Sequence, residues 1–596
     1  MRNAEATLAV IRERGKKSLD LEDVYRQLYN PDLYLMAYGR ISRNAGAMTR
    51  GTTQETVDGM SMGKIQDIIG LLRNERYRWT PVRRTFIPKA NGKLRPLGIP
   101  AWSDKLLQEV MRSLLDAYYE PQFSPHSHGF RPARGCHSAL KDILHAWTGV
   151  KWFIEGDIKG CFDNIDHAIL TSILREKIHD GRFLNLVENL IKAGYLEEWK
   201  YRPTLSGTPQ GGIVSPLLAN IYLDRLDKFV EQTLIPEFTK GGPKRKCKEY
   251  HRLTLAIWRA KAKGATEGDL KPLRRKARSL GASDPFDPNY RRLRYIRYAD
   301  DFLLGFDGPK EEAEEIKTRL GTFLRDHLKL ELSPEKTLIT HARTEKARFL
   351  GYNISTYNKP GLQGHGNITL RIPPQVIKAK AARYMAKGKP AGRPELIDDS
   401  DLSIVGLYGS EYRGYTQYYA YAANRYWLHY LHWVMATSLL KTLAGKHKST
   451  AKRMAQRFAA RVITRYGVMK CLQVEKPREG KAPLIATFGG IPLKTQPFAV
   501  IDEFSPGRDC IRTRAELEQR LRADECELCG SRGNIEVHHV RKLADLKVQG
   551  RRERPAWIRV MASRRRKTLI VCRECHDAIH AGRPTRMRDP QDAHPF

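Results

Sequence analysis

A pair of adjacent carboxylates inside an apolar segment constrains the fold of this chain more than any other feature. Asp300 and Asp301 follow the run Tyr295–Tyr298 and precede Phe302–Leu304, and both flanks are rich in apolar, β-prone residues. Such flanks predict two buried strands joined by an exposed acidic turn. Taken alone, an Asp-Asp pair could simply solvate the tip of a β-hairpin.

A third carboxylate stands at the end of a comparable segment upstream. Asp157 closes the run Lys151–Gly156, which predicts another buried strand. Carboxylate oxygens are the ligands that Mg²⁺ prefers. Two ions held by three such groups could activate an attacking oxygen and neutralise a leaving pyrophosphate, as polymerases do. We therefore expect Asp157, Asp300 and Asp301 to hold two Mg²⁺ ions.

The charge of the chain indicates a polyanionic partner. Among 596 residues, 104 Lys and Arg oppose 66 Asp and Glu, which gives a net charge of +38. So large an excess repels itself in a compact state, and long nucleic acid is the expected ligand. At roughly 100–200 residues per domain, the length predicts several domains. No apolar stretch approaches the roughly 18 residues that cross a bilayer and no signal peptide is evident, so we expect a cytoplasmic protein without membrane contact.

The first part of the chain predicts an α-rich extension followed by a basic hairpin. The extension covers residues 1–80 and shows helical apolar periodicity from about residue 19, and residues 83–100 predict two short strands joined by an Asn-Gly turn. Lys89 and Arg95 flank this turn and could hold a nucleotide triphosphate, although solvated basic residues on a surface hairpin are commoner. Residues 240–294 predict a basic, helical insert ahead of the acidic hairpin.

Two further features lie between these segments. Phe162, five residues beyond Asp157, could form the floor of a sugar pocket or simply pack in the core. The Gly/Pro-rich run Gly207–Gly212 contains Gln210 and precedes a predicted helix. Its glycines permit close backbone approach to a base pair or a phosphate, although a plain loop would look similar.

These parts, in this order, resemble the fingers and palm of a reverse transcriptase, and more closely those of a group II intron-encoded protein. The Gly-Thr-Pro-Gln-Gly-Gly run at 207–212 and the Tyr-Ala-Asp-Asp run at 298–301 carry the resemblance, which covers nearly the whole chain. It implies a right-hand polymerase with fingers and palm over residues 81–375. It assigns metal binding to the three carboxylates and places four residues at the incoming dNTP: Lys89 and Arg95 on the triphosphate, Phe162 as sugar gate, and Gln210 near the nascent pair.

Residues 376–470 differ in character, because aromatic and basic residues alternate along a long helical stretch. Aromatic rings can stack on bases while basic groups pair with phosphates, although a helical bundle would also use most of these rings as core. The stretch is similar to the α-helical thumb, or maturase, domain of the family, which implies binding of structured intron RNA. We expect phosphate contacts from Arg413 and from Lys446, His447 and Lys448. The resemblance implies a DNA-binding connector over residues 471–520.

The C-terminal residues 521–596 contain two Cys-x-x-Cys pairs. Cys526, Cys529, Cys572 and Cys575 have the spacing of a closed Cys₄ zinc site, which stabilises small domains that lack a large core. Such pairs in a reducing compartment indicate a metal site and not a disulfide framework. We therefore expect one structural Zn²⁺.

Four histidines near these cysteines predict a second metal site. His576 and His580 are four residues apart, so on a helix they face one way and could share a divalent ion with His538, while His539 acts as general base on water. This arrangement resembles an HNH nuclease, a ββα-metal fold that hydrolyses DNA. The central Asn of that pattern is missing, since Lys567-Thr568 stands in its place. A purely structural zinc ribbon is the alternative, and either Mg²⁺ or Mn²⁺ would suit the site.

The sequence thus predicts a multidomain α/β protein: a right-hand polymerase, an α-helical thumb and a zinc-stapled ββα-metal domain. The resemblance implies that the protein binds its intron RNA, promotes splicing, nicks target DNA and copies the RNA from the exposed 3′-hydroxyl, either as a monomer or as a dimer. Two other interpretations stay open: a splicing chaperone with a vestigial polymerase, and a defence-associated or domesticated reverse transcriptase without its own intron.

Overall fold

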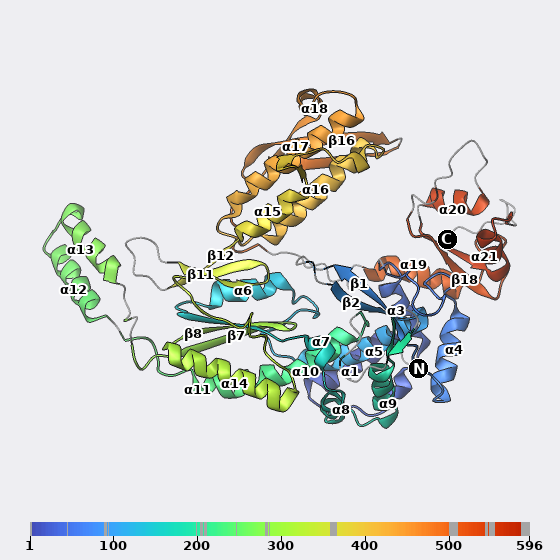
Figure 1. The fold of residues 1–596 in the computed structure, drawn as a ribbon, viewed down its shortest axis with the longest axis horizontal. Coiled ribbons are helices and arrows are strands. Elements are labelled where there is room, and N and C mark those ends of the chain that lie inside the picture. The colour runs from blue at the N-terminus through green and yellow to red at the C-terminus, as the bar shows by residue number, and fades with distance from the viewer. Residues whose placement is uncertain are drawn as a thin grey trace.

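The computed structural model of the chain is elongated, with a central sheet, a helical lobe above it and the C-terminal domain at one end beside the N-terminal helices (Figure 1). Within the described residues, no helix combines the length and the apolar character needed to cross a membrane. The structure describes residues 3–44, 46–88, 92, 94–197, 200–202, 207, 211–245, 247–280, 284, 287–357, 366–478, 480–499, 510–542, 546, 555–564 and 566–585.

The N-terminal region, for which the sequence predicts an α-rich extension, is built of helices whose starts are marked by capping residues. The side chains of Asn30 and Ser61 accept hydrogen bonds from backbone N–H groups in the first turns of α3 and α4, which satisfies donors that the helix leaves unpaired. The long helix α5 is buried along most of its length and forms the centre of this region. Its helices are α1 (Ala4–Lys16), α2 (Val24–Gln27), α3 (Pro31–Ile41), α4 (Met62–Arg73) and α5 (Trp102–Tyr119).

The hairpin predicted over residues 83–100 is present as two antiparallel strands. They belong to a sheet with the order β2-β1-β5-β6. Lys89 and the turn residue Asn91 lie outside the described residues, whereas Arg95 is exposed on β2, opposite Ile87. The strands are β1 (Val82–Pro88), β2 (Leu94–Ile99), β5 (Tyr195–Glu197) and β6 (Lys200–Arg202).

The central sheet has five strands in the order β3-β7-β8-β4-β9. β7 and β8 form the predicted acidic hairpin, and β4 runs antiparallel beside β8. Helix α6 covers one face of the sheet and α14 the other (Figure 1). These elements are β3 (Ser127–His128), β4 (Trp152–Asp157), β7 (Arg292–Tyr298), β8 (Asp301–Asp307), β9 (Ile339–His341), α6 (Cys136–Ala146), α10 (Ser215–Phe229) and α14 (Lys310–Leu328).

Shorter elements connect the central sheet to its neighbours. Along the chain, helices α7 to α9 connect β4 of the central sheet to β5 of the sheet that contains the hairpin. The sheet β10-β11-β12 connects the central sheet to the helical lobe. They span α7 (Cys161–Asn164), α8 (His167–Arg175), α9 (Gly181–Lys192), β10 (Ala347–Phe349), β11 (Tyr352–Tyr357) and β12 (Asn367–Arg371).

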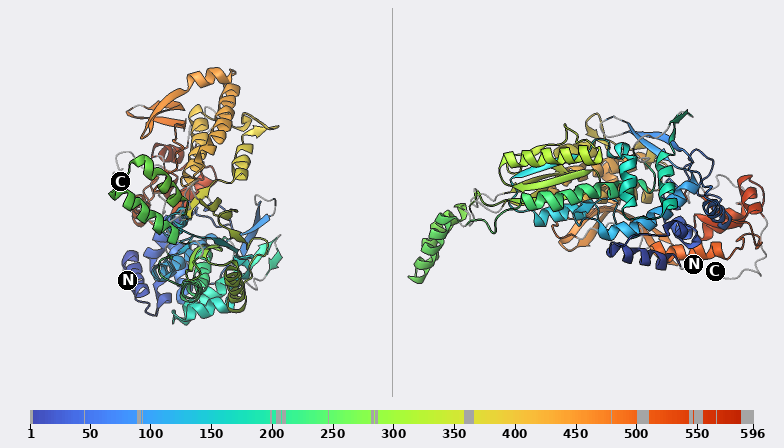
Figure 2. Two further views of the ribbon diagram at one scale, coloured as in Figure 1. Left: turned by 90° about the vertical axis from the view of Figure 1, so that its left-hand side faces the viewer. Right: turned by 90° about the horizontal axis from the view of Figure 1, so that it is seen from below.

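The basic insert contains two helices that form a hairpin, α12 (Lys248–Ala262) and α13 (Glu267–Leu280). This hairpin projects well away from the rest of the molecule (Figure 1 and the right view of Figure 2). Trp258 on α12 is 69% exposed, so an aromatic ring stands on the outside of a strongly basic arm.

The lobe above the central sheet combines helices with a sheet, which corrects the expectation of an all-helical unit ending at residue 470. Strand β16 crosses that boundary, and the sheet β15-β16-β17 packs against α16 through β16 and β17. The approach is close, because a Cβ atom on Gly409 would lie 2.1 Å from the carbonyl oxygen of Thr487. The elements are α15 (Pro374–Ala382), α16 (Asp401–Tyr418), α17 (Leu428–Lys446), α18 (Ala451–Arg457), β15 (Ala459–Thr464), β16 (Gly467–Arg478) and β17 (Lys481–Gly489).

The C-terminal domain consists of a two-stranded antiparallel sheet flanked by helices. Its apolar residues, among them Val537 and Ile570, belong to the same core cluster as Tyr38 and Met60 of the N-terminal region. The two ends of the chain therefore fold against each other, an arrangement that nothing in the sequence indicated. The elements are α19 (Cys510–Arg522), β18 (Ile535–His539), α20 (Ala556–Arg564), β19 (Thr568–Cys572) and α21 (Arg573–His580).

Candidate active sites

The three predicted carboxylates meet at one edge of the central sheet. Asp157 at the end of β4 is the register partner of Asp301 at the start of β8. Asp300 lies in the turn, where Ala299 has a positive φ of 55°, a conformation that L-residues seldom adopt. Burial raises the pKa of Asp300, and burial together with the charges of Asp300 and Asp157 raises the pKa of Asp301 to about 7. The cluster therefore favours a cation, and its oxygen donors fit Mg²⁺.

Two basic side chains act on this cluster. Lys336 donates hydrogen bonds to both carboxylate oxygens of Asp157, each at 2.9 Å. The charge of Arg95, on the basic hairpin, lowers the pKa of Asp300 against the larger effect of burial. Arg95 is therefore near enough to Asp300 for its charge to act on that carboxylate. The contact of Lys336 was missed, because Lys336 lies 179 residues from Asp157 and no local pattern joins them.

A buried ion pair contacts the backbone of the acidic turn next to the two carboxylates. Arg297 and Asp227 are fully buried and are joined by two hydrogen bonds, of 2.7 and 2.6 Å. Tyr295 donates to the same carboxylate at 2.7 Å, and the Arg297 guanidinium also donates to the carbonyl of Ala299 at 2.8 Å and to Asn220 at 3.1 Å. Because Ala299 precedes Asp300, this network fixes the position of the turn that carries the two carboxylates.

Phe162 and two glycines of the run at 207–212 make close contacts within the described residues. Phe162 on α7 is half-buried, and its ring meets that of the exposed Phe130 edge to face at 6.3 Å. Gly207 and Gly211 have positive φ values, and a Cβ atom on them would lie 2.6 Å from the Asp163 carbonyl oxygen and 2.3 Å from that of Gly98, respectively. Glycine is therefore required at both ends of the loop. Gln210, between them, lies outside the described residues.

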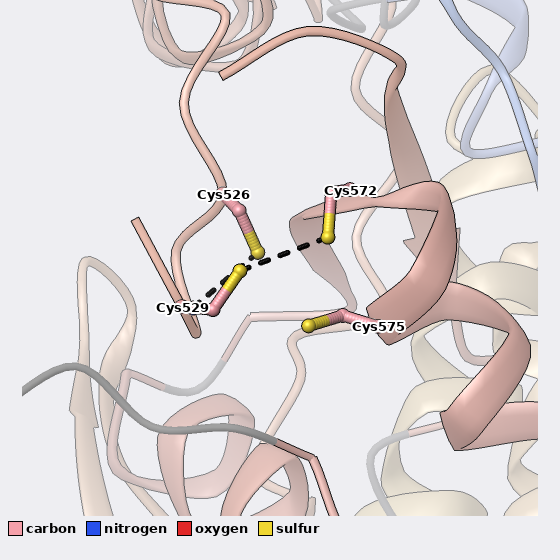
Figure 3. A group of neighbouring side chains, drawn as sticks. All are labelled: Cys526, Cys529, Cys572 and Cys575. Carbon is pink, nitrogen blue, oxygen red and sulfur yellow. Dashed lines mark hydrogen bonds between the residues drawn. The ribbon is translucent and has the colours of Figure 1, made fainter. Parts of the chain in front are cut away.

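The four predicted cysteines converge in the C-terminal domain (Figure 3). Their sulfur atoms all lie within 4.8 Å of one another, and those of Cys529 and Cys572 are 3.7 Å apart. Burial raises the pKa of Cys526 to about 11, so a cluster of thiolates needs a cation to form here. The donor set fits Zn²⁺ in a closed, tetrahedral structural site.

The predicted nuclease histidines also converge, and a residue from the N-terminal region joins them. Ligand atoms of His538, His576, His580 and Asp58 lie within 4.8 Å of one another. Burial would lower the pKa of His576, but Asp58 and Glu536 raise it to about 9, so this site too favours a positive charge. Imidazole and carboxylate donors fit a divalent ion. Asp58 was missed, because it lies far from the histidines in sequence.

His539 projects from the same strand and is held by Tyr38. The two side chains share a buried hydrogen bond of 2.7 Å between the Tyr38 hydroxyl and Nε2 of His539. Burial lowers the pKa of His539 to about 4, so the imidazole is neutral at pH 7, as a general base must be. Thr568, which stands where the HNH pattern has Asn, is the register partner of His539 on β19.

A basic pocket of about 870 Å³ lies beside His539, between the N-terminal region and the C-terminal domain. Cationic side chains from both parts of the chain line it and outnumber its one carboxylate, Glu516, which pairs with Arg566, so the pocket has the charge that a nucleic acid phosphate requires. These residues are Arg43, Arg520, Arg541, Lys542, Arg566 and Lys567.

The expected RNA contacts of the helical lobe differ in their surroundings. Lys446 donates to the carbonyls of Ile397 and Asp399 and so holds the segment before α16 in place. His447 contacts the carboxylate of Asp401, the first residue of α16, at 2.9 Å. Arg413 and Lys448 are exposed.

Aromatic residues of the lobe are divided between its core and its surface. Tyr408 and Tyr412 are buried, in agreement with a role as core. A second set of rings is exposed, on the two residues before α17 and along the start of that helix, whereas the sequence analysis expected core packing for most rings of the stretch as a whole. The exposed rings are Tyr426, Trp427, Tyr430 and Trp433, which are 38–60% exposed.

The fold and the sites define a class: a nucleic acid polymerase with a metal-dependent nuclease domain on the same chain. Comparison with known families agrees part by part. Residues 87–354 match the family Reverse transcriptase (RNA-dependent DNA polymerase), residues 368–495 match Type II intron maturase, and residues 526–576 match AI2M/AI1M-like, HNH endonuclease.

Curated relatives extend the likeness to the whole chain. The chain is 40% identical to the Group II intron-encoded protein LtrA of Lactococcus lactis subsp. cremoris, over 96% of this chain and 98% of that protein. It is 35% identical to the uncharacterized 91 kDa protein in cob intron of Schizosaccharomyces pombe, over 94% of this chain and 70% of that protein. The chain belongs to the group II intron-encoded proteins, and it is an RNA-directed DNA polymerase with maturase and HNH endonuclease domains.

Proposed function

We propose that this protein binds its own intron RNA, promotes its splicing, and then inserts the intron into DNA by nicking the target and copying the RNA from the nick. The observation that carries the proposal is the presence of both sites on one chain, with Asp157 beside Asp301 in register and the three nuclease histidines around a common point. A vestigial polymerase has no physical reason to keep buried carboxylates whose mutual repulsion is unfavourable without metal. We place its action in the bacterial cytoplasm at the nucleoid.

For the polymerase, we propose a right hand with fingers and palm over residues 81–375 and a thumb over 376–470 extended by β16 and β17. Two Mg²⁺ ions, when bound by Asp157, Asp300 and Asp301, supply activation of the 3′-hydroxyl and charge neutralisation at the leaving pyrophosphate. Arg95, with Lys89, binds the triphosphate, and Phe162 beside Phe130 excludes a 2′-hydroxyl from the sugar pocket. Gln210 contacts the nascent pair.

RNA recognition is proposed for the exposed side of the lobe. Arg413 and Lys448 contact phosphates, and the exposed rings of Tyr430 and Trp433 stack on unpaired bases. Lys446 and His447 are expected to act indirectly, since Lys446 already binds the segment before α16 and His447 the first residue of that helix. We also propose that residues 471–520 form a connector that contacts DNA.

For the nuclease, we propose that His538, His576 and His580 hold Mg²⁺ or Mn²⁺ while His539 removes a proton from the attacking water. The Cys526, Cys529, Cys572 and Cys575 site binds Zn²⁺ and stabilises the domain over residues 521–596. The basic pocket beside His539 binds the backbone of the DNA strand that is cut.

Primer extension tests the polymerase assignment directly. Purified protein is incubated with poly(rA)/oligo(dT), dTTP and Mg²⁺, and wild type is compared with the Asp300→Ala/Asp301→Ala variant. A matched control is Glu314→Ala/Glu315→Ala, which removes two exposed carboxylates from α14. Wild type and the control variant are expected to extend the primer, whereas the Asp300→Ala/Asp301→Ala variant is expected to be inactive. A wild type that binds and splices intron RNA without extending any primer would favour the splicing-chaperone interpretation. Extension without binding of intron RNA would favour a domesticated polymerase.

A further inference from the structure

The segment that precedes α4 lies against the edge of the nuclease sheet. Met60 and Val537 form an antiparallel bridge, in which the Val537 N–H donates to the Met60 carbonyl at 2.9 Å. The N–H of Gly59 in turn donates to the Val537 carbonyl at 3.1 Å. Val57 and Met60 are fully buried, so the segment is anchored on both sides of Asp58. The N-terminal region thus adds a short piece of strand to β18, immediately before the two functional histidines.

This docking directs the carboxylate of Asp58 into the nuclease site. Its oxygens lie 2.8 Å from Nε2 of His580, 3.3 Å from Nε2 of His576 and 3.5 Å from Nδ1 of His538. One oxygen also accepts a hydrogen bond of 2.7 Å from the backbone N–H of His539. Asp58 therefore touches each of the three histidines that the nuclease proposal assigns to the metal.

The geometry of the group suits a shared ion better than a set of hydrogen bonds. Neither ring nitrogen of His538 makes a hydrogen bond within the described part of the chain, although both are buried. Nε2 of His576 and Nε2 of His580 lie 3.2 Å apart, a separation that two donors on one small cation adopt. A buried imidazole that makes no hydrogen bond is costly, and coordination of a metal ion would satisfy it.

We propose that Asp58 is a fourth protein ligand of the nuclease metal, supplied by the N-terminal region of the chain. The inference rests on the proposed nuclease site, to which it adds a donor from outside the HNH domain. A carboxylate oxygen beside three imidazole nitrogens is a donor set that divalent transition metals accept. Asp58 and the three histidines would hold the ion, which would supply a Lewis acid for the water and the DNA phosphate.

A functional consequence follows from linkage. An ion bound by both halves of the chain favours the docked arrangement, because a ligand stabilises the state that binds it more tightly. Metal binding at the nuclease and docking of residues 57–61 are therefore coupled. The nuclease is expected to bind its metal fully only when it is seated on the N-terminal region.

Cobalt binding to the full-length protein tests the proposal without relying on nuclease activity. The protein is prepared with Zn²⁺ in the Cys₄ site and titrated with Co²⁺, whose visible absorption reports the number and kind of ligands. Wild type is compared with Asp58→Ala and with Asp58→Asn, which keeps the size of the side chain. Asp67→Ala, an exposed carboxylate on α4, is the matched control, and His580→Ala removes an assumed ligand. Retained zinc and an unchanged circular dichroism spectrum show that each variant is folded.

The expected result is a loss of Co²⁺ affinity of at least roughly tenfold in Asp58→Ala, since even outer partners of metal ligands contribute about 10–100-fold. The visible spectrum should change with it, and Asp67→Ala should match wild type. In hydrogen exchange, Co²⁺ should protect residues 57–61 in wild type and not in Asp58→Ala. Unchanged affinity and spectrum in both Asp58 variants would overturn the proposal. If His580→Ala also bound Co²⁺ like wild type, the nuclease metal site itself would be wrong.

Discussion

Removal of one partner from the buried ion pair behind the acidic turn should destabilise the polymerase strongly. Asp227→Ala leaves the Arg297 guanidinium fully buried without its counter-ion, and also removes the acceptor of the Tyr295 hydroxyl. Breaking a desolvated pair in this way typically costs about 3–5 kcal/mol. For a domain of this size each kcal/mol lowers the melting temperature by roughly 2–4 °C, so the central domain should melt roughly 6–20 °C lower. Primer extension should fall as well, because Arg297 also binds the carbonyl of Ala299.

Two further variants make this prediction specific. Asp326→Ala breaks an exposed pair with Arg325 and should leave the melting temperature nearly unchanged. The double variant Asp227→Leu/Arg297→Met replaces both charges and should recover much of the stability, since a buried pair contributes little relative to apolar residues that pack well. Scanning calorimetry of the full-length protein measures all three. A shift below about 2 °C in Asp227→Ala would show that the pair is not desolvated, and the reasoning would fail.

Three other predictions concern the metal sites and the general base. The folded-state pKa of Asp301, about 7, exceeds the ordinary value of 3.8, so ionisation of this group destabilises the metal-free fold as pH rises between these values. Mg²⁺ binds the ionised form and should therefore raise the melting temperature more at pH 8 than at pH 6. Equal increases in melting temperature at the two pH values would contradict this prediction. Removal of zinc from the cysteine site should unfold the C-terminal domain and make it sensitive to protease, while primer extension persists. A C-terminal domain that resists protease without zinc would show that the zinc is not structural. Tyr38→Phe should slow DNA nicking several-fold through His539 with Co²⁺ affinity unchanged; an unaltered nicking rate at saturating DNA would exclude a positioning role.

The elements of the polymerase site that the sequence predicts are those with local signals. Apolar strands with an acidic turn place Asp300 and Asp301 by turn chemistry alone, and Asp157 ends a strand of the same composition. The cysteine pairs likewise carry their spacing in the sequence. In each case the residues that act together are close in the chain or lie on elements with a strong pattern.

The parts that sequence reasoning missed depend on contacts between distant segments. Asp227 pairs with Arg297 across 70 residues, and Asp58 meets His580 across 522 residues. Neither aspartate stands in a pattern that distinguishes it from a solvated one. The strands β15 to β17 were missed for another reason: they are largely exposed, so their apolar alternation is weak, and they follow directly after helices.

A coupled reaction on target DNA tests the central claim that one chain nicks DNA and copies RNA from the nick. The purified complex of protein and intron RNA is mixed with labelled DNA that spans the insertion site, dNTPs and Mg²⁺, and the products are separated by length. Wild type should yield a nicked strand extended by cDNA. Asp300→Ala/Asp301→Ala should nick without extending, and His539→Ala should extend only DNA that is already nicked. Covalently extended DNA from the Asp300→Ala/Asp301→Ala variant would contradict the account.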